Sequence, residues 1–166
     1  MILNVFVLDE DPARAAVYHN DVHVRKMILE STQMLSTAVR LNNPGKDLGV
    51  YKVAYTKHPC TLKCINNRSN FRWVLELAEN LAEEYKFRFD KTHASARILP
   101  EIRRHINTIP EGSLEFAQAM PDEYKNQCPV TAYRTYYKKD KIYMKNGKYM
   151  AVYTSRPIPE FLHGYA

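Results

Sequence analysis

Apolar residues recur at three- and four-residue spacing in two long segments of the chain, and this spacing is typical of amphipathic helices. The recurring positions are Val24, Met27, Ile28, Ser31, Met34, Leu35 and Ala38 in the first segment, and Trp73, Val74, Leu77, Ala78, Leu81 and Tyr85 in the second. We therefore expect one helix over residues 22–41, ended by Asn42-Asn-Pro-Gly45, and another over residues 69–89, capped by Ser69 or Asn70.

Shorter elements are indicated elsewhere in the chain. The apolar, β-branched run of residues 2–8 predicts a buried strand, and Asp11 followed by Pro12 predicts a short helix through Tyr18. Residues 46–68 have an irregular pattern, whereas short helices are expected over residues 94–105 (interrupted at Pro100), 110–120 and 129–138. Asn146-Gly147, within residues 141–153, is a two-residue hairpin signal.

The expected fold class is mainly α (α+β): a compact helical single domain over residues 1–166, with a short N-terminal strand and the option of a C-terminal β-hairpin. No apolar run approaches the ~20 residues that a membrane-spanning helix needs, so we expect no membrane partner. The first nine residues lack the basic leader and cleavage site of a signal peptide. Three cysteines, an odd number, favour reduced thiols and a cytoplasmic protein.

A polar row accompanies the core stripe of the first long helix. His23, Lys26, Glu30 and Gln33 follow one another at helical spacing, so their side chains lie on one face. Imidazole, amine and carboxylate are the groups that proton transfer and nucleophilic attack require. The same row also fits an ordinary solvated helix face, on which a Lys26–Glu30 pair contributes only a few tenths of a kcal/mol, about 0.2–0.5.

A second polar cluster is expected to meet this row if the two long helices pack antiparallel, since the end of the second would then lie near the start of the first. Candidate substrate-binding residues on this basis are His19, Asp21, Gln33, His58, Asn70, Arg88, Lys91 and His93. Arg88 and Lys91 also fit a structural role, because cations are favourable at the end of a helix.

The sequence indicates neither a metal site nor a cofactor. His19 and His23 are four residues apart, but a helix break expected near Asp21 would spoil that spacing. Cys60 and Cys64 have no partner pair at zinc-site spacing. The five glycines form no phosphate-binding or dinucleotide-binding loop, and no Gly-x-Ser-x-Gly motif occurs, which disfavours kinases, P-loop enzymes, nicotinamide enzymes and hydrolases of that type.

Positive charge is concentrated near the C-terminus. The chain has a net charge of +6, and residues 125–156 hold eight Lys and Arg against one Asp, so the rest is close to neutral. Tyrosines alternate with these cations, a pattern that suits phosphate contacts and base stacking or, alternatively, a basic surface whose tyrosines pack inward. The candidate nucleic-acid-binding residues are Arg134, Lys138, Lys139, Lys141, Lys145, Lys148, Tyr136 and Tyr137.

A set of short motifs runs along residues 8–161: Asp11-Pro-Ala-Arg-Ala-Ala, Asp21-Val-His-Val-Arg-Lys-Met-Ile-Leu-Glu, His58-Pro-Cys, Asn70-Phe-Arg-Trp, Glu84-Tyr-Lys-Phe-Arg88, Lys91-Thr-His93, Ala119-Met-Pro-Asp-Glu-Tyr-Lys125 and Tyr133-Arg-Thr-Tyr-Tyr137. Together they resemble a family of small, mostly uncharacterised phage proteins, some of which are labelled pyrimidine-dimer DNA glycosylase. The resemblance implies a small, basic, mainly helical DNA-repair protein in the cytoplasm of an infected bacterial host.

Such glycosylases flip a nucleotide out of the duplex, attack its sugar with an amine, and cleave the strand through a Schiff base with the help of a helix carboxylate. The resemblance nominates Glu30 as that carboxylate. In the best-known members the amine is the N-terminus exposed by removal of the initiator methionine, but Ile2 is too bulky for that removal. Lys26, one turn before Glu30, is the remaining candidate nucleophile.

The leading hypothesis is therefore a DNA glycosylase/AP lyase that acts on a flipped nucleotide. Lys26 would attack C1′, Glu30 would stabilise the developing positive charge, and His23 would shuttle protons. One alternative is a transferase that modifies a nucleotide or base with the same polar row. The other is a non-enzymatic phage effector that binds a host protein or nucleic acid.

Overall fold

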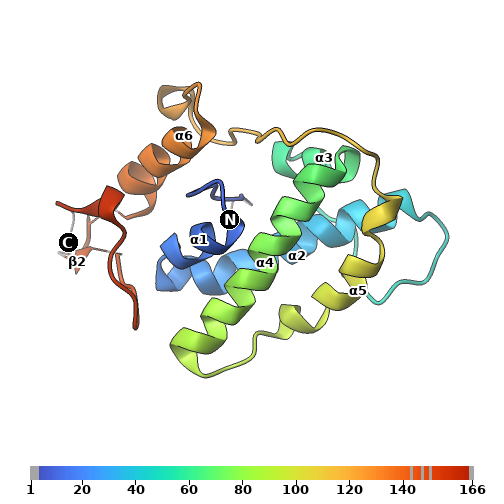
Figure 1. The fold of residues 1–166 in the computed structure, drawn as a ribbon, viewed down its shortest axis with the longest axis horizontal. Helices are drawn as coiled ribbons and strands as arrows, with labels where there is room; N and C mark the ends of the chain where they lie inside the picture. Colours follow the sequence, from blue (N-terminus) through green and yellow to red (C-terminus); the bar gives the residue numbers. More distant parts are fainter. Residues whose placement is uncertain (1–3, 143, 147, 150, 165–166) are drawn as a thin grey trace.

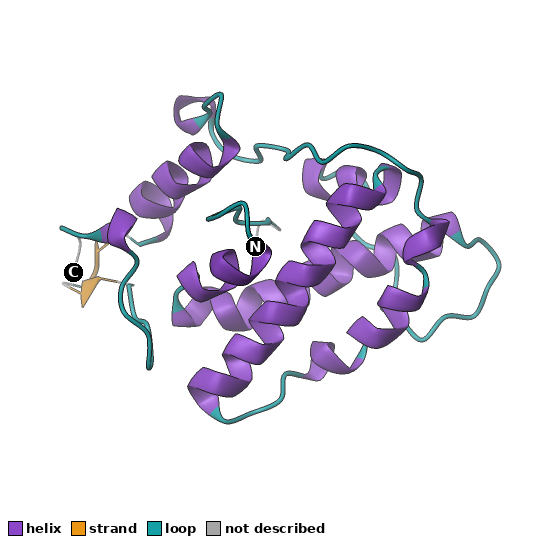
Figure 2. Ribbon diagram, viewed as in Figure 1, coloured by secondary structure: helices purple, strands orange, loops and turns teal. Residues whose placement is uncertain are grey.

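A computed structural model describes residues 4–142, 144–146, 148–149 and 151–164. Six α-helices occur in these residues, which confirms the mainly α class (Figures 1 and 2). Their bounds are α1 Pro12–Tyr18, α2 Asp21–Asn42, α3 Pro59–Asn66, α4 Arg68–Phe89, α5 Leu99–Arg104 and α6 Pro129–Tyr136. No described helix combines the length and the apolar character that crossing a membrane demands.

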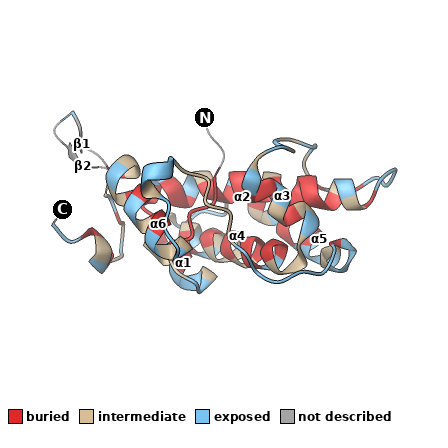
Figure 3. Ribbon diagram, turned by 90° about the horizontal axis from the view of Figure 1, so that it is seen from above, coloured by how far each residue is buried: buried red, intermediate tan, exposed pale blue. Residues whose placement is uncertain are grey.

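The two long helices α2 and α4 form the centre of the molecule, and buried residues concentrate along both (Figure 3). Both were predicted, and both begin at an asparagine N-cap: Asn20 accepts from His23 N, and Asn67 accepts from Ser69 N and Asn70 N. Asn67 thus replaces Ser69 or Asn70 as the expected cap of α4. The end of α4 lies beside the start of α2, as the ion pair between Arg88 and Asp21 shows.

The expected N-terminal strand is wrong for the described residues 4–8, which form no strand. Val5, Phe6, Val7 and Leu8 are instead buried on all sides, and Leu8 N donates to Phe6 O in a tight turn. Figure 1 shows this segment passing between α6 and the central helices. A short apolar run predicts that a segment is buried, but it does not distinguish a strand from a buried segment without sheet partners.

Two further segments differ from the prediction. Residues 59–66 form α3, for which His58 is the N-cap and Pro59 the first helical residue, a start signal that the sequence contained. Residues 110–119 form no helix. Their carbonyls bond to the start of α4 instead, since Ser69 Oγ donates to Gly112 O and Asn67 Nδ2 to Ser113 O.

The other short helices that were predicted are present, with small changes in their bounds. α1 begins at Pro12 after the Asp11 cap. The expected helix over residues 94–105 is divided into a 3₁₀ turn, Ala94–Arg97, and α5. Residues 106–108, 122–124 and 160–162 add three more 3₁₀ turns.

α6 continues into a π-helical turn, Tyr137–Lys141, and then into two-residue strands β1, Met144–Lys145, and β2, Lys148–Tyr149. The strands pair antiparallel with Met144 opposite Tyr149 and Lys145 opposite Lys148. The hairpin expected over residues 141–153 includes residues 143, 147 and 150, which lie outside the described part of the chain.

Candidate functional site

The polar row of α2 is not a solvated helix face. His23 and Glu30 are buried, with exposed fractions of 8% and 3%, while Lys26 and Gln33 are half-buried. The row is enclosed by the N-terminal segment, through Phe6, and by the π-helical turn after α6, through Tyr137. An ionisable row that is removed from water in this way requires an explanation beyond solubility.

Glu30 is the central group of the row. Its Oε2 accepts a 2.9 Å hydrogen bond from the backbone N–H of Asn4, and its Oε1 lies 3.9 Å from Lys26 Nζ. Oε1 is buried and accepts no hydrogen bond from the described residues. Burial raises the pKa of the carboxyl, against the opposing effects of the Asn4 N–H, Lys26 and Lys141. The carboxyl is therefore suited to taking up and releasing a proton.

Among the described residues, the charges of two amines, Lys26 and Lys141, act on this carboxyl. The side chain of Lys26 is 33% exposed, so its ammonium connects the buried Glu30 to solvent. Lys141, from the π-helical turn, lies with its Nζ 4.8 Å from the ring centre of Tyr136 and 6.0 Å from that of Phe6. Its charge acts on both Glu30 and His23. Lys141 had been expected only as a phosphate contact, and its placement here depends on Tyr137 of the same turn, which binds Asn20 and His23.

His23 is fixed and neutral. Its Nδ1 is 2.8 Å from the hydroxyl of Tyr137, which also accepts from Asn20 N at 2.9 Å. Burial, with smaller contributions from the charges of His19, Lys26 and Lys141, lowers the pKa of His23 to about 3. The imidazole therefore stays neutral at physiological pH and keeps its hydrogen bond with Tyr137.

The second predicted cluster does meet the start of α2, as a buried ion network. Arg88, whose side chain is fully buried, donates from Nη1 to Asp21 at 3.1 Å and from Nε to Glu84 at 2.8 Å. Asp21 also accepts from the backbone and hydroxyl of Thr154, and Arg156 binds both oxygens of Glu84. This network joins α2, α4 and the C-terminal segment, and so it stabilises their packing.

His19 lies beside this network. It is completely buried, its Nδ1 is 2.6 Å from Ala15 O, and Arg88 Nη1 donates to the His19 carbonyl. Burial, with a smaller effect from the charge of Arg88, lowers the pKa of His19 to about 4, against the Ala15 hydrogen bond. Arg156, which completes the network, was identified from the sequence only as part of the basic segment, because its partner Glu84 is 72 residues away.

The other expected substrate-binding residues have local partners or lie apart from the row. His58 caps α3 by accepting from Cys60 N, and His93 caps the 3₁₀ turn by accepting from Ser95 N. Asn70 bonds to the backbone of Glu115 in both directions. Lys91 is exposed just beyond α4.

The basic segment divides into buried tyrosines and outward cations. Tyr137 is fully buried and Tyr136 nearly so, which makes their rings unavailable for stacking on bases and corrects that expectation. Lys139 is exposed and Lys138 half-buried. Arg134 donates to Leu8 O and Asp9 and lies against Phe161, so it anchors both chain ends while one-third exposed. Lys145 and Lys148 belong to β1 and β2.

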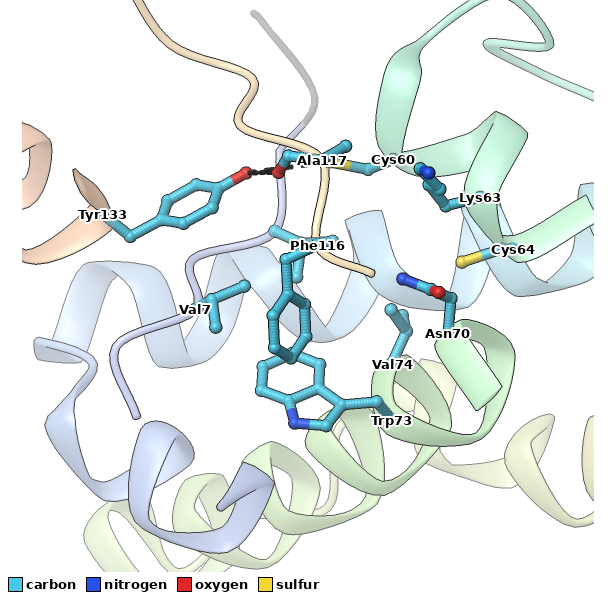
Figure 4. Close-up of a pocket in the computed structure, with 11 residues that line it drawn as sticks. Val7, Cys60, Lys63, Cys64, Asn70, Trp73, Val74, Phe116, Ala117 and Tyr133 are labelled. Carbon is cyan, nitrogen blue, oxygen red and sulfur yellow. Dashed lines mark hydrogen bonds between the residues drawn. The ribbon is translucent and has the colours of Figure 1, made fainter. Parts of the chain in front are cut away.

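An apolar pocket that sequence reasoning missed lies between α3, α4 and residues 116–117 (Figure 4). Its walls include Cys60, Cys64, Trp73, Phe116 and Tyr133, and its volume of about 20 Å³ accommodates about one water molecule. Burial raises the pKa of Cys60 to about 11 and that of Cys64 further. Both thiols therefore stay protonated, and the described residues contain no group of three His, Cys, Asp or Glu placed to hold a metal ion.

Comparison of the chain with known protein families, with curated proteins and with solved structures finds no match. The phage-glycosylase resemblance consequently stays an expectation.

Proposed function

We propose that the protein acts on DNA as a glycosylase/AP lyase, with Lys26 and Glu30 as its reacting pair. One observation carries this proposal: a buried carboxyl, held by a backbone N–H on one oxygen, has its other oxygen 3.9 Å from an amine that reaches solvent. The amine can meet a substrate, while the carboxyl is shielded from water. Amine nucleophiles in proteins depend on such a neighbouring proton acceptor.

The reaction begins with proton transfer from the Lys26 ammonium to Glu30, whose raised pKa makes the carboxylate a better acceptor. The neutral amine then forms a bond to C1′ of a flipped nucleotide as the glycosidic C–N bond breaks. The departing base takes the proton from Glu30. Ring opening moves the second amine proton to O4′ and leaves a Schiff base, after which Glu30 accepts a C2′ proton as the 3′ phosphate leaves.

Cations near this pair supply the attraction for DNA. Lys141 reaches over Phe6 and Tyr136 beside the reacting pair, and Lys138 and Lys139 precede it on the same π-helical turn. Contacts between these side chains and phosphates would make affinity fall steeply with salt. His23 and Tyr137 are hydrogen-bonded to each other at one side of the site and do not exchange protons with the substrate at neutral pH.

The test is borohydride trapping on labelled duplexes that contain either an abasic site or a pyrimidine dimer. We expect a covalent protein–DNA adduct with the wild-type chain and none with Lys26→Ala. Lys63→Ala is a matched control, because Lys63 is also 33% exposed and also paired with a glutamate, Glu115. An adduct that persists in Lys26→Ala, or no adduct with any duplex, contradicts the proposal.

A further inference from the structure

Tyr55 combines exposure with an unfavourable backbone conformation. Its side chain is 51% exposed, and its φ of 55° lies in the left-handed region, which residues with a Cβ rarely adopt. Such an outlier persists only when its surroundings impose it, and outliers of this kind concentrate at functional sites. Val53, two residues earlier, is also exposed, with a fraction of 45%.

The loop that carries Tyr55 is fastened on both sides. Thr37 of α2 donates to Ala54 O at 2.9 Å and accepts from Ala54 N at 3.0 Å, so the residue before Tyr55 is held directly on the helix. After it, His58 N donates to Tyr55 O at 3.1 Å, at the start of α3. Arg40 binds the carbonyls of Val50 and Tyr51 further upstream. The ring is therefore presented from an ordered backbone.

Two chains of contacts connect this loop with the helix face and the segment around Glu30. Thr37 continues the polar row of α2, about two turns after Glu30 and one after Gln33, on the same face. At the other end of the loop, Cys60 Sγ lies 4.0 Å from Asn4 Oδ1, and the backbone N–H of that asparagine binds Glu30. The loop is thus linked to Glu30 through Asn4, and its other contact, Thr37, lies further along the same helix face, about 10 Å beyond Glu30 on α2.

The charge of this region favours a polyanion. Residues 48–75 contain five Lys and Arg and no Asp or Glu. Lys63 and Arg68 pair with glutamates from residues 111–115, whereas Lys52 and Lys57, on either side of Tyr55, are exposed. An exposed aromatic ring between exposed cations is the arrangement with which proteins bind single-stranded nucleic acid.

We propose that Tyr55 is a base-stacking platform for the unpaired part of a nucleic-acid strand, another nucleotide of which, several positions away, enters the Lys26–Glu30 site. Lys52 and Lys57 contact the phosphates on either side of the stacked base. The inference rests on the proposed function, because it takes the strand at Tyr55 and the nucleotide at Lys26 to belong to one substrate.

Binding of fluorescein-labelled single-stranded DNA, measured by anisotropy over a salt series, tests the platform. We expect Tyr55→Ala to weaken binding roughly tenfold, because one stacked base is lost, and Tyr55→Phe to bind within about twofold of wild type. Lys57→Ala should lower the slope of log affinity against log salt by about 0.7, the value for one phosphate contact on a single strand. Phe87→Ala, which removes a ring of similar exposure (55%) from α4, is the control.

A second variant, Tyr55→Trp, reports stacking directly and keeps a large aromatic ring at this position, so that a loss of folding is not mistaken for a loss of stacking. Tyr55→Trp should keep wild-type affinity and show quenched tryptophan fluorescence when DNA binds. Unchanged affinity in Tyr55→Ala, or unquenched fluorescence in DNA-bound Tyr55→Trp, overturns the platform. If the wild-type chain still gives a Lys26-dependent adduct in that case, the proposed function stands without it. A wild-type chain that neither binds DNA nor forms an adduct overturns both.

Discussion

The backbone N–H of Asn4 donates to Oε2 of Glu30 over 2.9 Å, which fastens the N-terminal segment to the middle of α2. The same asparagine donates from its side chain to Ala119 O and accepts from Val5 N. One residue thus joins α2 to the segment that precedes α6. The link also buries Glu30, so the carboxyl with the raised pKa exists only in the folded chain.

Removal of the acceptor at position 30 should therefore cost stability as well as activity. Glu30→Ala leaves the Asn4 N–H buried without its partner, and we expect the free energy of unfolding to fall by about 1–3 kcal/mol. Glu30→Gln retains an oxygen acceptor and should lose less than about 1 kcal/mol. Urea unfolding at neutral pH measures both. Equal losses in the two variants would show that this hydrogen bond does not stabilise the fold.

Much of the helical framework could be predicted, because long amphipathic helices carry their signal in consecutive residues. α2 and α4 have core stripes over many turns, and caps that a few residues determine. The conformation of residues 4–8 could not be predicted in this way, because an apolar run without periodicity is compatible with a strand or with a buried segment outside any sheet. The helix predicted over residues 110–120 was wrong because side chains more than 40 residues away bind the backbone groups of this segment.

The candidate site was predictable only in part, for the same reason. The ion pair of Lys26 and Glu30 could be predicted, because the two residues are four positions apart on one helix. The features that change their chemistry come from distant parts of the chain, namely Asn4, Lys141 and Tyr137. No periodicity indicates such contacts, and without them the row resembles an ordinary polar face.

Neutral buried histidines should make the protein sensitive to acid. The pKa values of His19 and His23 in the folded chain, about 4 and about 3, lie below the unfolded value of 6.5, so unfolding takes up protons as the pH falls. Stability from these groups is complete above pH 6.5 and declines toward pH 4. Each histidine should contribute up to ~1.4 kcal/mol per pH unit in this interval.

His23→Gln tests this dependence, because it keeps a polar partner for Tyr137 and removes one titrating group. Urea unfolding at several pH values between 7 and 4.5 should give a shallower loss of stability than in the wild-type chain. Replacement of the exposed His163 is the control and should leave the slope unchanged. A wild-type slope in His23→Gln would mean that this imidazole does not stay neutral on folding.

The three thiols should differ sharply in reactivity. Cys60 and Cys64 are buried with raised pKa values, whereas Cys128 is exposed and a hydrogen bond from Thr131 lowers its pKa. A chromogenic disulfide reagent should titrate one thiol promptly in the native chain and three in denaturant. Cys128→Ser should abolish the prompt reaction. Rapid reaction of two or three thiols would indicate that the pocket between α3 and α4 opens readily.

Arg88 should be the most costly charged residue to remove. Its guanidinium donates to Glu84, Asp21 and the carbonyls of Val17 and His19, and its side chain is fully buried. Arg88→Ala leaves two carboxylates short of a partner in a buried site, a change that typically costs about 3–5 kcal/mol.

Arg103→Ala is the matched comparison, since Arg103 also makes two hydrogen bonds to a single glutamate, Glu79, but is 48% exposed. Solvent screens an ion pair at such a position, and we expect its loss to cost less than about 1 kcal/mol. Thermal and urea unfolding of both variants measure the difference. Similar costs in the two variants would mean that the Arg88 network is open to water in solution, and that the C-terminal segment carrying Thr154 and Arg156 does not stay closed over it.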